Sequence, residues 1–453
     1  MRSEKEVYDI VLNFAKTDKR IRMVTLEGSR TNTNIPPDDF QDFDITFFVT
    51  DMDSFTSDDK WLDIFGERLI LQKPEDMELF PAVEKGFSYL MLFTDDVKID
   101  LTLLPLELID EYFTWDKLVK LLLDKDNRIV KPPIPTDIDY HLQKPTQRMF
   151  DDCCNEFWNT TTYVVKGLCR KEILFAIDHM NDIVRKELLR MISWLIGIKQ
   201  GFHFSLGKNY KFMKQYVPEE LWERLMSTYN MDSYPHMWES FEQCMALFRE
   251  VSSEVACQLD YQYPLYDEKI SNYVIRQKKK YGIVTTGSEV FKGRIKDTFS
   301  PVIREKLAEF PSEEIDQIYV DDEKEHILEA IKKQIAAGAE LIICTGGMSV
   351  DPDDCTPWAI MSTGARVVSY GAPVLPGAMM LVSYYKNEAD GRIIPILGLP
   401  GCVMYAKRTI FDLVLPRVMA DDEITAEDIA KLGEGGLCLN CGVCTFPNCG
   451  FGK

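Results

Sequence analysis

The chain has 453 residues, of which 45% are hydrophobic and 11% aromatic, and this length predicts two or three folded domains. The net charge of −21 disfavours a nucleic-acid partner, which needs a basic surface, and favours cationic ligands, although many soluble proteins are simply acidic. The sequence has no run of 18 apolar residues and begins with a charged segment. We therefore expect no membrane partner, no secretory signal and a cytoplasmic location.

The first part of the chain has the pattern of a small α/β domain. Residues 4–16 predict a helix, with Val7, Val11 and Phe14 on one face. Apolar runs that predict strands follow at residues 23–28, 43–49, 87–93 and 97–104. We place this domain at residues 1–135.

The pattern then changes to that of a helical domain, which we place at residues 136–281. Long amphipathic runs predict helices at residues 172–198, 218–229 and 237–259. The last helix is expected to run to Gly282, a glycine suited to a helix C-cap, with the next strand starting at once.

A third domain is predicted at residues 283–419, where strands and helices alternate in a way typical of a parallel sheet. The fold class is therefore multidomain α/β. The predicted strands are residues 283–287, 317–320, 340–347, 366–372 and 393–401, and the predicted helices are residues 301–310 and 324–338.

Three acidic residues in the first domain form its strongest chemical signal. Asp42 and Asp44 are two apart in D-F-D, so on a strand both carboxylates point to one face. Two adjacent carboxylates repel unless a cation lies between them, and Mg²⁺ carried with ATP is the usual cation. Asp100 lies in an otherwise apolar strand, where a carboxylate is costly to bury without a partner. Together they predict a site for metal-assisted phosphoryl chemistry, whereas D-x-D alone would more often be a solvated strand end.

A glycine turn upstream supports this interpretation. Gly28 and Ser29 follow a predicted strand, where a glycine allows the backbone to approach phosphate oxygens closely. Arg30 could donate two hydrogen bonds to the same phosphates. We therefore predict Gly28, Ser29 and Arg30 to bind the nucleotide.

These motifs carry a family resemblance. The segment LEGSRTNTNIPPDDFQDFD (26–44), the following KIDLTLLP and FWNTTTYVVKGLCRKE (157–172) resemble the aminoglycoside 6-adenylyltransferases, which modify streptomycin. The resemblance runs to about residue 280. It implies a nucleotidyltransferase fold, in which a mixed sheet carries an acidic triad and a helical substrate-binding domain follows. It also implies that Asp42 and Asp44 hold Mg²⁺ on ATP, and that Asp100 is a third ligand or the base for the substrate hydroxyl.

Three charged residues of the helical part could contribute to binding. Lys166 and Arg170 lie four residues apart on a predicted helix and could reach ATP phosphates. A solvated basic helix face is an equally good interpretation. Glu156 could pair with an ammonium or guanidinium group of an aminoglycoside, or it could be an ordinary surface charge.

Glycine turns recur in the third domain, each after a predicted strand, where free backbone N–H groups can bind an anion. The T-G-G-M-S motif of residues 345–349 is the clearest of them. From about residue 283 to 419 the chain resembles the molybdopterin-binding domain of molybdenum-cofactor biosynthesis proteins, which implies a three-layer α/β fold. By motif match, molybdopterin would contact Thr345, Gly346, Gly347, Ser349 and Asp354, together with Asp322 or its neighbour Asp321.

The tail at residues 436–453 contains four cysteines, spaced C-x2-C-x2-C-x4-C. Four thiolates within twelve residues can bind one zinc ion or one iron–sulfur cluster, and the spacing favours a [4Fe–4S] cluster slightly. A flexible tail of free or oxidised thiols is the alternative. The cysteines are Cys438, Cys441, Cys444 and Cys449.

We therefore predict a Mg-ATP-dependent enzyme that transfers AMP to a hydroxyl of a streptomycin-type aminoglycoside, at the 6-position, and so confers resistance. The third domain would be a fused molybdopterin-binding unit. The alternatives are that both parts serve molybdenum-cofactor synthesis, with the first as an accessory adenylyltransferase, or that the third domain only binds and senses a pterin.

Overall fold

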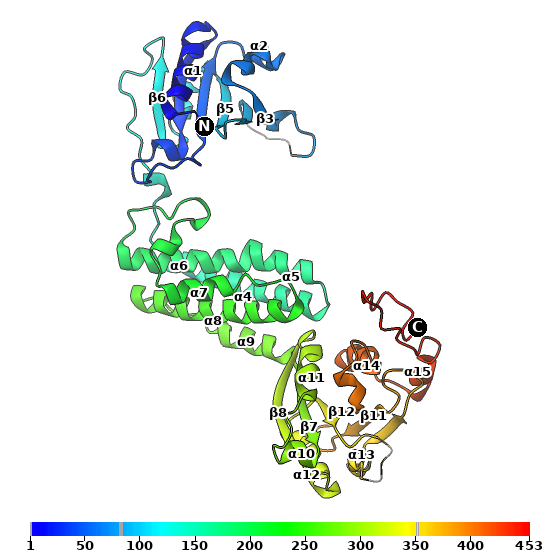
Figure 1. Cartoon of the computed structure of the whole chain (residues 1–453). Coiled ribbons are helices and arrows are strands. Elements are labelled where there is room, and N and C mark those ends of the chain that lie inside the picture. Colours follow the sequence, from blue (N-terminus) through cyan, green and yellow to red (C-terminus); the bar gives the residue numbers. More distant parts are fainter. Residues whose placement is uncertain (1, 81–84, 350, 352) are drawn as a thin grey trace. The chain divides into compact units, whose positions relative to one another are not determined.

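The computed structural model describes residues 2–80, 85–349, 351 and 353–453 (Figure 1). The chain divides into two compact units, Met1–Lys144 with Ile196–Tyr216, and Pro145–Leu195 with Val217–Lys453. The first unit contains one sheet, and the second contains a set of long helices and another sheet. In the described part of the chain, no helix is long and apolar enough to cross a membrane.

The first sheet has six strands in the order β3-β4-β5-β2-β1-β6. Strands β2 and β5 are parallel and every other neighbouring pair is antiparallel, so the predicted mixed sheet is confirmed. Apolar side chains of α1 (Glu4–Thr17), including Val7 and Val11, are buried in the same core as Phe47 of the sheet. The strands are β1 (Ile21–Glu27), β2 (Phe43–Val49), β3 (Arg68–Gln72), β4 (Phe87–Phe93), β5 (Lys98–Pro105) and β6 (Val119–Asp124).

Two strands of this sheet were not predicted, and both are at its edges. In β3 the apolar residues Leu69 and Ile70 are adjacent and both more than half exposed, so the strand lacks the alternation that marks a half-buried strand. In β6 only Val119 is buried. Edge strands have one neighbour, and their sequences are correspondingly less constrained.

The helical part consists of α4 to α9. The predicted helix over 172–198 is confirmed as helical. It consists of α5 and α6, joined by a π-helical turn at Met180–Val184. The rings of Phe157 on α4 and Phe248 on α8 are stacked with centroids 3.6 Å apart, and Trp158 is fully buried beside them. The helices are α4 (Gln147–Cys169), α5 (Ile173–His179), α6 (Arg185–Gln200), α7 (Glu219–Ser227), α8 (Tyr234–Leu259) and α9 (Tyr266–Arg276).

The second sheet has the order β10-β11-β12-β9-β7-β8. Strands β8, β7, β9 and β12 pair in parallel as predicted. Strand β11, which was not predicted, pairs antiparallel with both β12 and β10, so the sheet is mixed rather than parallel throughout. The strands are β7 (Lys279–Thr286), β8 (Ser312–Val320), β9 (Leu341–Thr345), β10 (Arg366–Tyr370), β11 (Leu381–Lys386) and β12 (Ile393–Leu399).

Helices cover both faces of this sheet, which confirms the three-layer arrangement. Neighbouring strand residues such as Ile283 and Val284 belong to different cores because successive side chains point to opposite faces. The first core contains α11 (Phe299–Ala308) and α14 (Ile410–Met419); the second contains α12 (Lys324–Ala336) and α13 (Thr356–Ser362).

The predicted C-cap at Gly282 is wrong. Helix α9 ends at Arg276, and Gly282 lies within β7. A β-carbon at this position would lie 2.3 Å from the side chain of Gln334, so the glycine allows α12 to pack closely on the sheet.

Candidate active site

The three predicted carboxylates come together at one end of the first sheet. Asp44 and Asp100 lie directly opposite each other on the parallel strands β2 and β5. Asp42 precedes β2 by one residue. The register of β2 and β5 therefore brings the carboxylates of residues far apart in the chain to one place, as the sequence predicted.

A lysine that the sequence analysis missed joins two of these acids. The Nζ atom of Lys98 lies 2.8 Å from an Oδ atom of Asp42 and 2.9 Å from one of Asp100. Burial opposes the charge on Lys98, but the two carboxylates outweigh it and raise the pKa of the lysine. The signal was present in the sequence, because Lys98 stands two residues before Asp100 on the same strand and so shares its face.

Burial also acts on the acids. It raises the pKa of Asp44 to about 6, with further contributions from the charges of Asp100, Asp42 and Glu27, while Lys98 opposes the change. The pKa of Asp100 is raised as well, first by burial, against the lowering effect of Lys98. The site therefore holds more negative charge than its own surroundings neutralise.

This charge excess fits a cation supplied with the substrate. The Oδ1 atom of Asp100 is buried and has no hydrogen-bond partner among the described residues, although buried carboxylate oxygens are normally paired. Carboxylate oxygens are the ligands that Mg²⁺ prefers. Within the described residues, however, no three His, Cys, Asp or Glu side chains are gathered closely enough to hold a metal ion by themselves. In the triad, Lys98 lies between two of the acids.

The Gly28-Ser29-Arg30 segment forms a single 3₁₀ turn after β1. Gly28 has φ of +69°, and a β-carbon there would lie 2.5 Å from an Oδ atom of Asp44, so a glycine is required for both conformation and space. The turn thus lies against the triad.

Arg30 is already engaged with the triad loop. Its guanidinium donates to the backbone carbonyls of Asp42 at 3.0 Å and Gln41 at 2.6 Å, and it stacks on the ring of Phe43 at 3.7 Å. These contacts hold the chain just before β2 in place. Arg30, Asp42 and Lys98 also line a cavity of about 540 Å³.

A second group that the sequence analysis missed lies next to Asp44. Glu27 is opposite Asp44 on β1 and accepts hydrogen bonds from the hydroxyls of Thr46 and Tyr112. The Tyr112 hydroxyl also lies 2.6 Å from that of Thr25. This network fixes a fourth carboxylate beside the triad, and no local motif marks it because Tyr112 is 85 residues away in the chain.

The three predicted binding residues of the helical part lie on or just after α4, and all are exposed. The ammonium of Lys166 lies 5.6 Å from the ring of Tyr163. Arg170 is the C-cap of α4 rather than part of its face, a position at which a cation favours the helix dipole. Glu156 is on the exposed side of the helix. Their roles in binding stay predictions.

The predicted anion-binding loop of the third domain follows β9. Thr345 ends that strand and is buried, and its hydroxyl has no hydrogen-bond partner among the described residues. Gly346 and Gly347 both have positive φ, and a β-carbon on Gly346 would lie 2.0 Å from the carbonyl oxygen of Thr286. This close approach of two strand ends leaves room only for glycine.

The two predicted acids of this domain each accept a hydrogen bond from a loop. Asp354 accepts from the backbone N–H of Ser349 at 2.7 Å, and Asp322 accepts from that of Ser288 at 2.9 Å. Asp321 instead pairs with His326 at 2.7 Å. Asp322 is therefore the acid that reaches the loop after β7.

Comparisons with known proteins match two successive parts of the chain. The family described as "Streptomycin adenylyltransferase" matches residues 1–277, and the family described as "Probable molybdopterin binding domain" matches residues 282–420. An aminoglycoside 6-adenylyltransferase of Bacillus subtilis is 58% identical over 275 residues, which is 60% of this chain and 97% of that protein.

Two further relatives cover the two parts separately. A crystal structure of an aminoglycoside 6-adenyltransferase from Bacillus subtilis is 51% identical and covers 60% of this chain and 98% of its own, with a TM-score of 0.31. A molybdopterin adenylyltransferase of Pyrococcus furiosus is 26% identical over 137 residues, 28% of this chain and 80% of that protein.

Proposed function

The chain belongs to the streptomycin adenylyltransferase family through residues 1–277 and is a nucleotidyltransferase, and we propose that it transfers AMP from Mg-ATP to a hydroxyl of a streptomycin-type aminoglycoside. The observation that carries the proposal is the pairing of Asp44 with Asp100 across β2 and β5, with a buried oxygen of Asp100 left without a partner among the described residues. Such a site accepts a divalent cation and the phosphates attached to it.

The residues divide the work as follows. Asp42 and Asp44 hold the Mg²⁺ that arrives with ATP, and Gly28 leaves space beside Asp44 for the phosphates. The substrate hydroxyl oxygen bonds to the α-phosphorus, the bond from that phosphorus to the β-phosphate oxygen breaks, and pyrophosphate leaves. Asp100 takes the hydroxyl proton, and its raised pKa suits this role because a proton acceptor works best when its pKa approaches the working pH.

Lys98 has a role of its own in this proposal. Without nucleotide it neutralises Asp42 and Asp100. Mg²⁺ held by Asp42 would displace the ammonium from that carboxylate, at the edge of the cavity that Lys98 lines. There it can pair with a phosphate oxygen, so a charge that stabilises the free protein also serves the bound nucleotide.

The substrate class rests on charge and on the relatives. The chain has 73 acidic and 52 basic residues, and the site itself carries four carboxylates. An acidic surface raises the local concentration of a polycation such as an aminoglycoside. The Bacillus subtilis relative, 97% of which is matched, is named an aminoglycoside 6-adenylyltransferase. This name supports transfer to the 6-hydroxyl and a role in resistance.

Pyrophosphate release from Mg-ATP tests the proposal across a panel of aminoglycosides. We expect release that depends on streptomycin, that requires Mg²⁺, and that is abolished in Asp42→Asn and Asp44→Asn. Asp9→Asn is the matched control because Asp9 is exposed on α1 and does not line the cavity that Lys98 lines. Release without any aminoglycoside, or none with any member of the panel, would contradict the proposal.

A second activity, the binding of molybdopterin, is supported by residues 282–420. The observation that favours it is the glycine loop after β9, in which the buried hydroxyl of Thr345 has no partner among the described residues. Backbone N–H groups of this loop can bind an anion such as the pterin phosphate. Equilibrium binding of molybdopterin to the full chain tests it, and equal binding by a Gly346→Ala variant would contradict this location.

A further inference from the structure

The cysteine-rich tail folds back onto the third domain instead of extending away from it. The backbone N–H of Leu375 donates to the carbonyl of Gly436 at 2.6 Å, and that of Cys438 donates to the carbonyl of Leu375 at 2.8 Å. Close to the other end of the tail, Phe451 is only 4% exposed and belongs to the core on one face of the sheet. The tail is thus anchored on both sides of its four cysteines.

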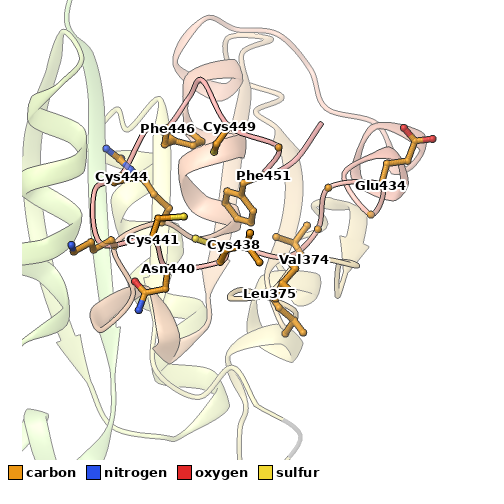
Figure 2. A pocket seen from close by; sticks show the side chains of 18 of the residues that line it. Val374, Leu375, Glu434, Cys438, Asn440, Cys441, Cys444, Phe446, Cys449 and Phe451 are labelled. Atoms are coloured by element: carbon orange, nitrogen blue, oxygen red, sulfur yellow. The ribbon is translucent and has the colours of Figure 1, made fainter.

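The four cysteines of the tail all line one cavity of about 790 Å³ (Figure 2). Figure 2 shows them along a single loop, with Phe446 and Phe451 from the same tail and Val374 from the body of the domain. Most of the cavity wall is apolar, and Cys441 and Cys444 are exposed to solvent at it. Its cysteines are Cys438, Cys441, Cys444 and Cys449.

Two basic side chains also line this cavity. They are Lys407 and Arg408, which follow the last strand of the sheet. Arg408 pairs with Asp412 at 2.9 Å and lies over the ring of Phe446 at 4.8 Å, so its guanidinium is held at the wall. Cations at this wall favour a ligand set that is negatively charged, as four thiolates around a metal group are.

A single ion and a cluster make different demands on the four thiols. One zinc ion with Zn–S bonds of about 2.3 Å requires four sulfurs within about 3.8 Å of one another. Among the described residues no three such ligands are gathered at one point, and all four tail cysteines are free thiols. The four cysteines line a cavity of about 790 Å³, which has room for a cluster, and the C-x2-C-x2-C spacing favours a [4Fe–4S] cluster.

We propose that the tail cavity binds a [4Fe–4S] cluster through Cys438, Cys441, Cys444 and Cys449. The cluster is received preassembled, by exchange of ligands. Each chain thiol forms one Fe–S bond as one donor thiolate leaves its iron, and the proton of the chain thiol passes to that leaving thiolate. Iron and sulfide keep their oxidation states, so the exchange needs no oxidant or reductant.

The full chain tests this proposal when it is incubated without oxygen with a preformed [4Fe–4S] cluster held by a small thiol, and then desalted. We expect about four irons and about four sulfides per chain, with the broad visible absorption of a thiolate-bound cluster and an electron paramagnetic resonance signal after reduction. Cys441→Ala should lose most of the iron. Cys257→Ala is the matched control because Cys257 is an exposed cysteine on α8.

Several results would overturn the proposal. One zinc per chain without sulfide, binding of no metal group, or equal loss of iron in Cys441→Ala and Cys257→Ala would each do so. Cys441 is exposed, so its replacement should not unfold the domain, and the spectra of the unaltered chain do not depend on any variant. Streptomycin-dependent pyrophosphate release should be the same in Cys441→Ala and in the unaltered chain, which separates failure of this site from failure of the adenylyltransferase.

Discussion

Asp44→Asn should abolish AMP transfer and at the same time stabilise the chain without metal. The pKa of Asp44 in the fold is about 6, against an ordinary value of 3.8, and each pKa unit corresponds to about 1.4 kcal/mol. Between pH 3.8 and about 6 the folded chain holds a proton on Asp44 that the unfolded chain has released. The free energy of unfolding therefore falls as the pH rises through this range. Above it the ionised carboxylate costs about 3 kcal/mol, and asparagine removes that cost.

Amide hydrogen exchange in β2 and β5 of the full chain measures this effect where it arises. Without Mg²⁺, protection of these strands in Asp44→Asn should exceed that of the unaltered chain, by a margin that grows as the pH rises from about 5 to about 7.5. Asp9→Asn, an exposed replacement on α1, should show no such margin. A variant that is no more protected than the unaltered chain, or a margin independent of pH, would refute the argument that burial and neighbouring charges raise the pKa of Asp44.

Three other substitutions test neighbouring parts of the account. Lys98→Met should lower the thermal stability of the metal-free chain by about 1 kcal/mol, since the pair is partly exposed, and should enlarge the stabilisation that Mg²⁺ gives; an unchanged melting temperature would contradict this. Gly28→Ala should reduce kcat/KM for AMP transfer at least about 10-fold. Gly293→Ala should not reduce it, because Gly293 has a similar positive φ but no described atom lies within 4 Å of the added carbon. Gly346→Ala should weaken molybdopterin binding at least about 10-fold in a titration and leave AMP transfer unchanged, and loss of both would contradict separate sites.

Local patterns in the sequence were sufficient for the elements with strong periodicity. The D-F-D spacing predicted that Asp42 and Asp44 lie close together. The apolar run around Asp100 predicted a strand in which a single buried carboxylate requires a charged partner. The same reasoning could have found Lys98, which shares the face of Asp100, but a lysine near a strand start is unremarkable until its partners are known. The sequence cannot show that β2 and β5 are neighbours, because their register depends on the whole sheet.

The missed features depend on contacts between distant residues. Glu27 is fixed by Tyr112, and no spacing rule connects the two. Gly282 looked like the end of a helix because glycine favours C-caps, whereas its actual reason is the side chain of Gln334 packed over β7. Strand β11 was missed, and its antiparallel pairing with β12 and β10 depends on contacts across the sheet rather than on a local pattern.

The central claim is transfer of AMP to an aminoglycoside, and the mass of the product tests it most directly. Streptomycin incubated with the chain, ATP and Mg²⁺ should gain the mass of one AMP unit, with one pyrophosphate formed for each modified molecule. The Asp42→Asn chain should leave streptomycin unchanged. Unmodified streptomycin and related aminoglycosides after incubation with the unaltered chain, or a modified product formed equally by Asp42→Asn, would contradict the account.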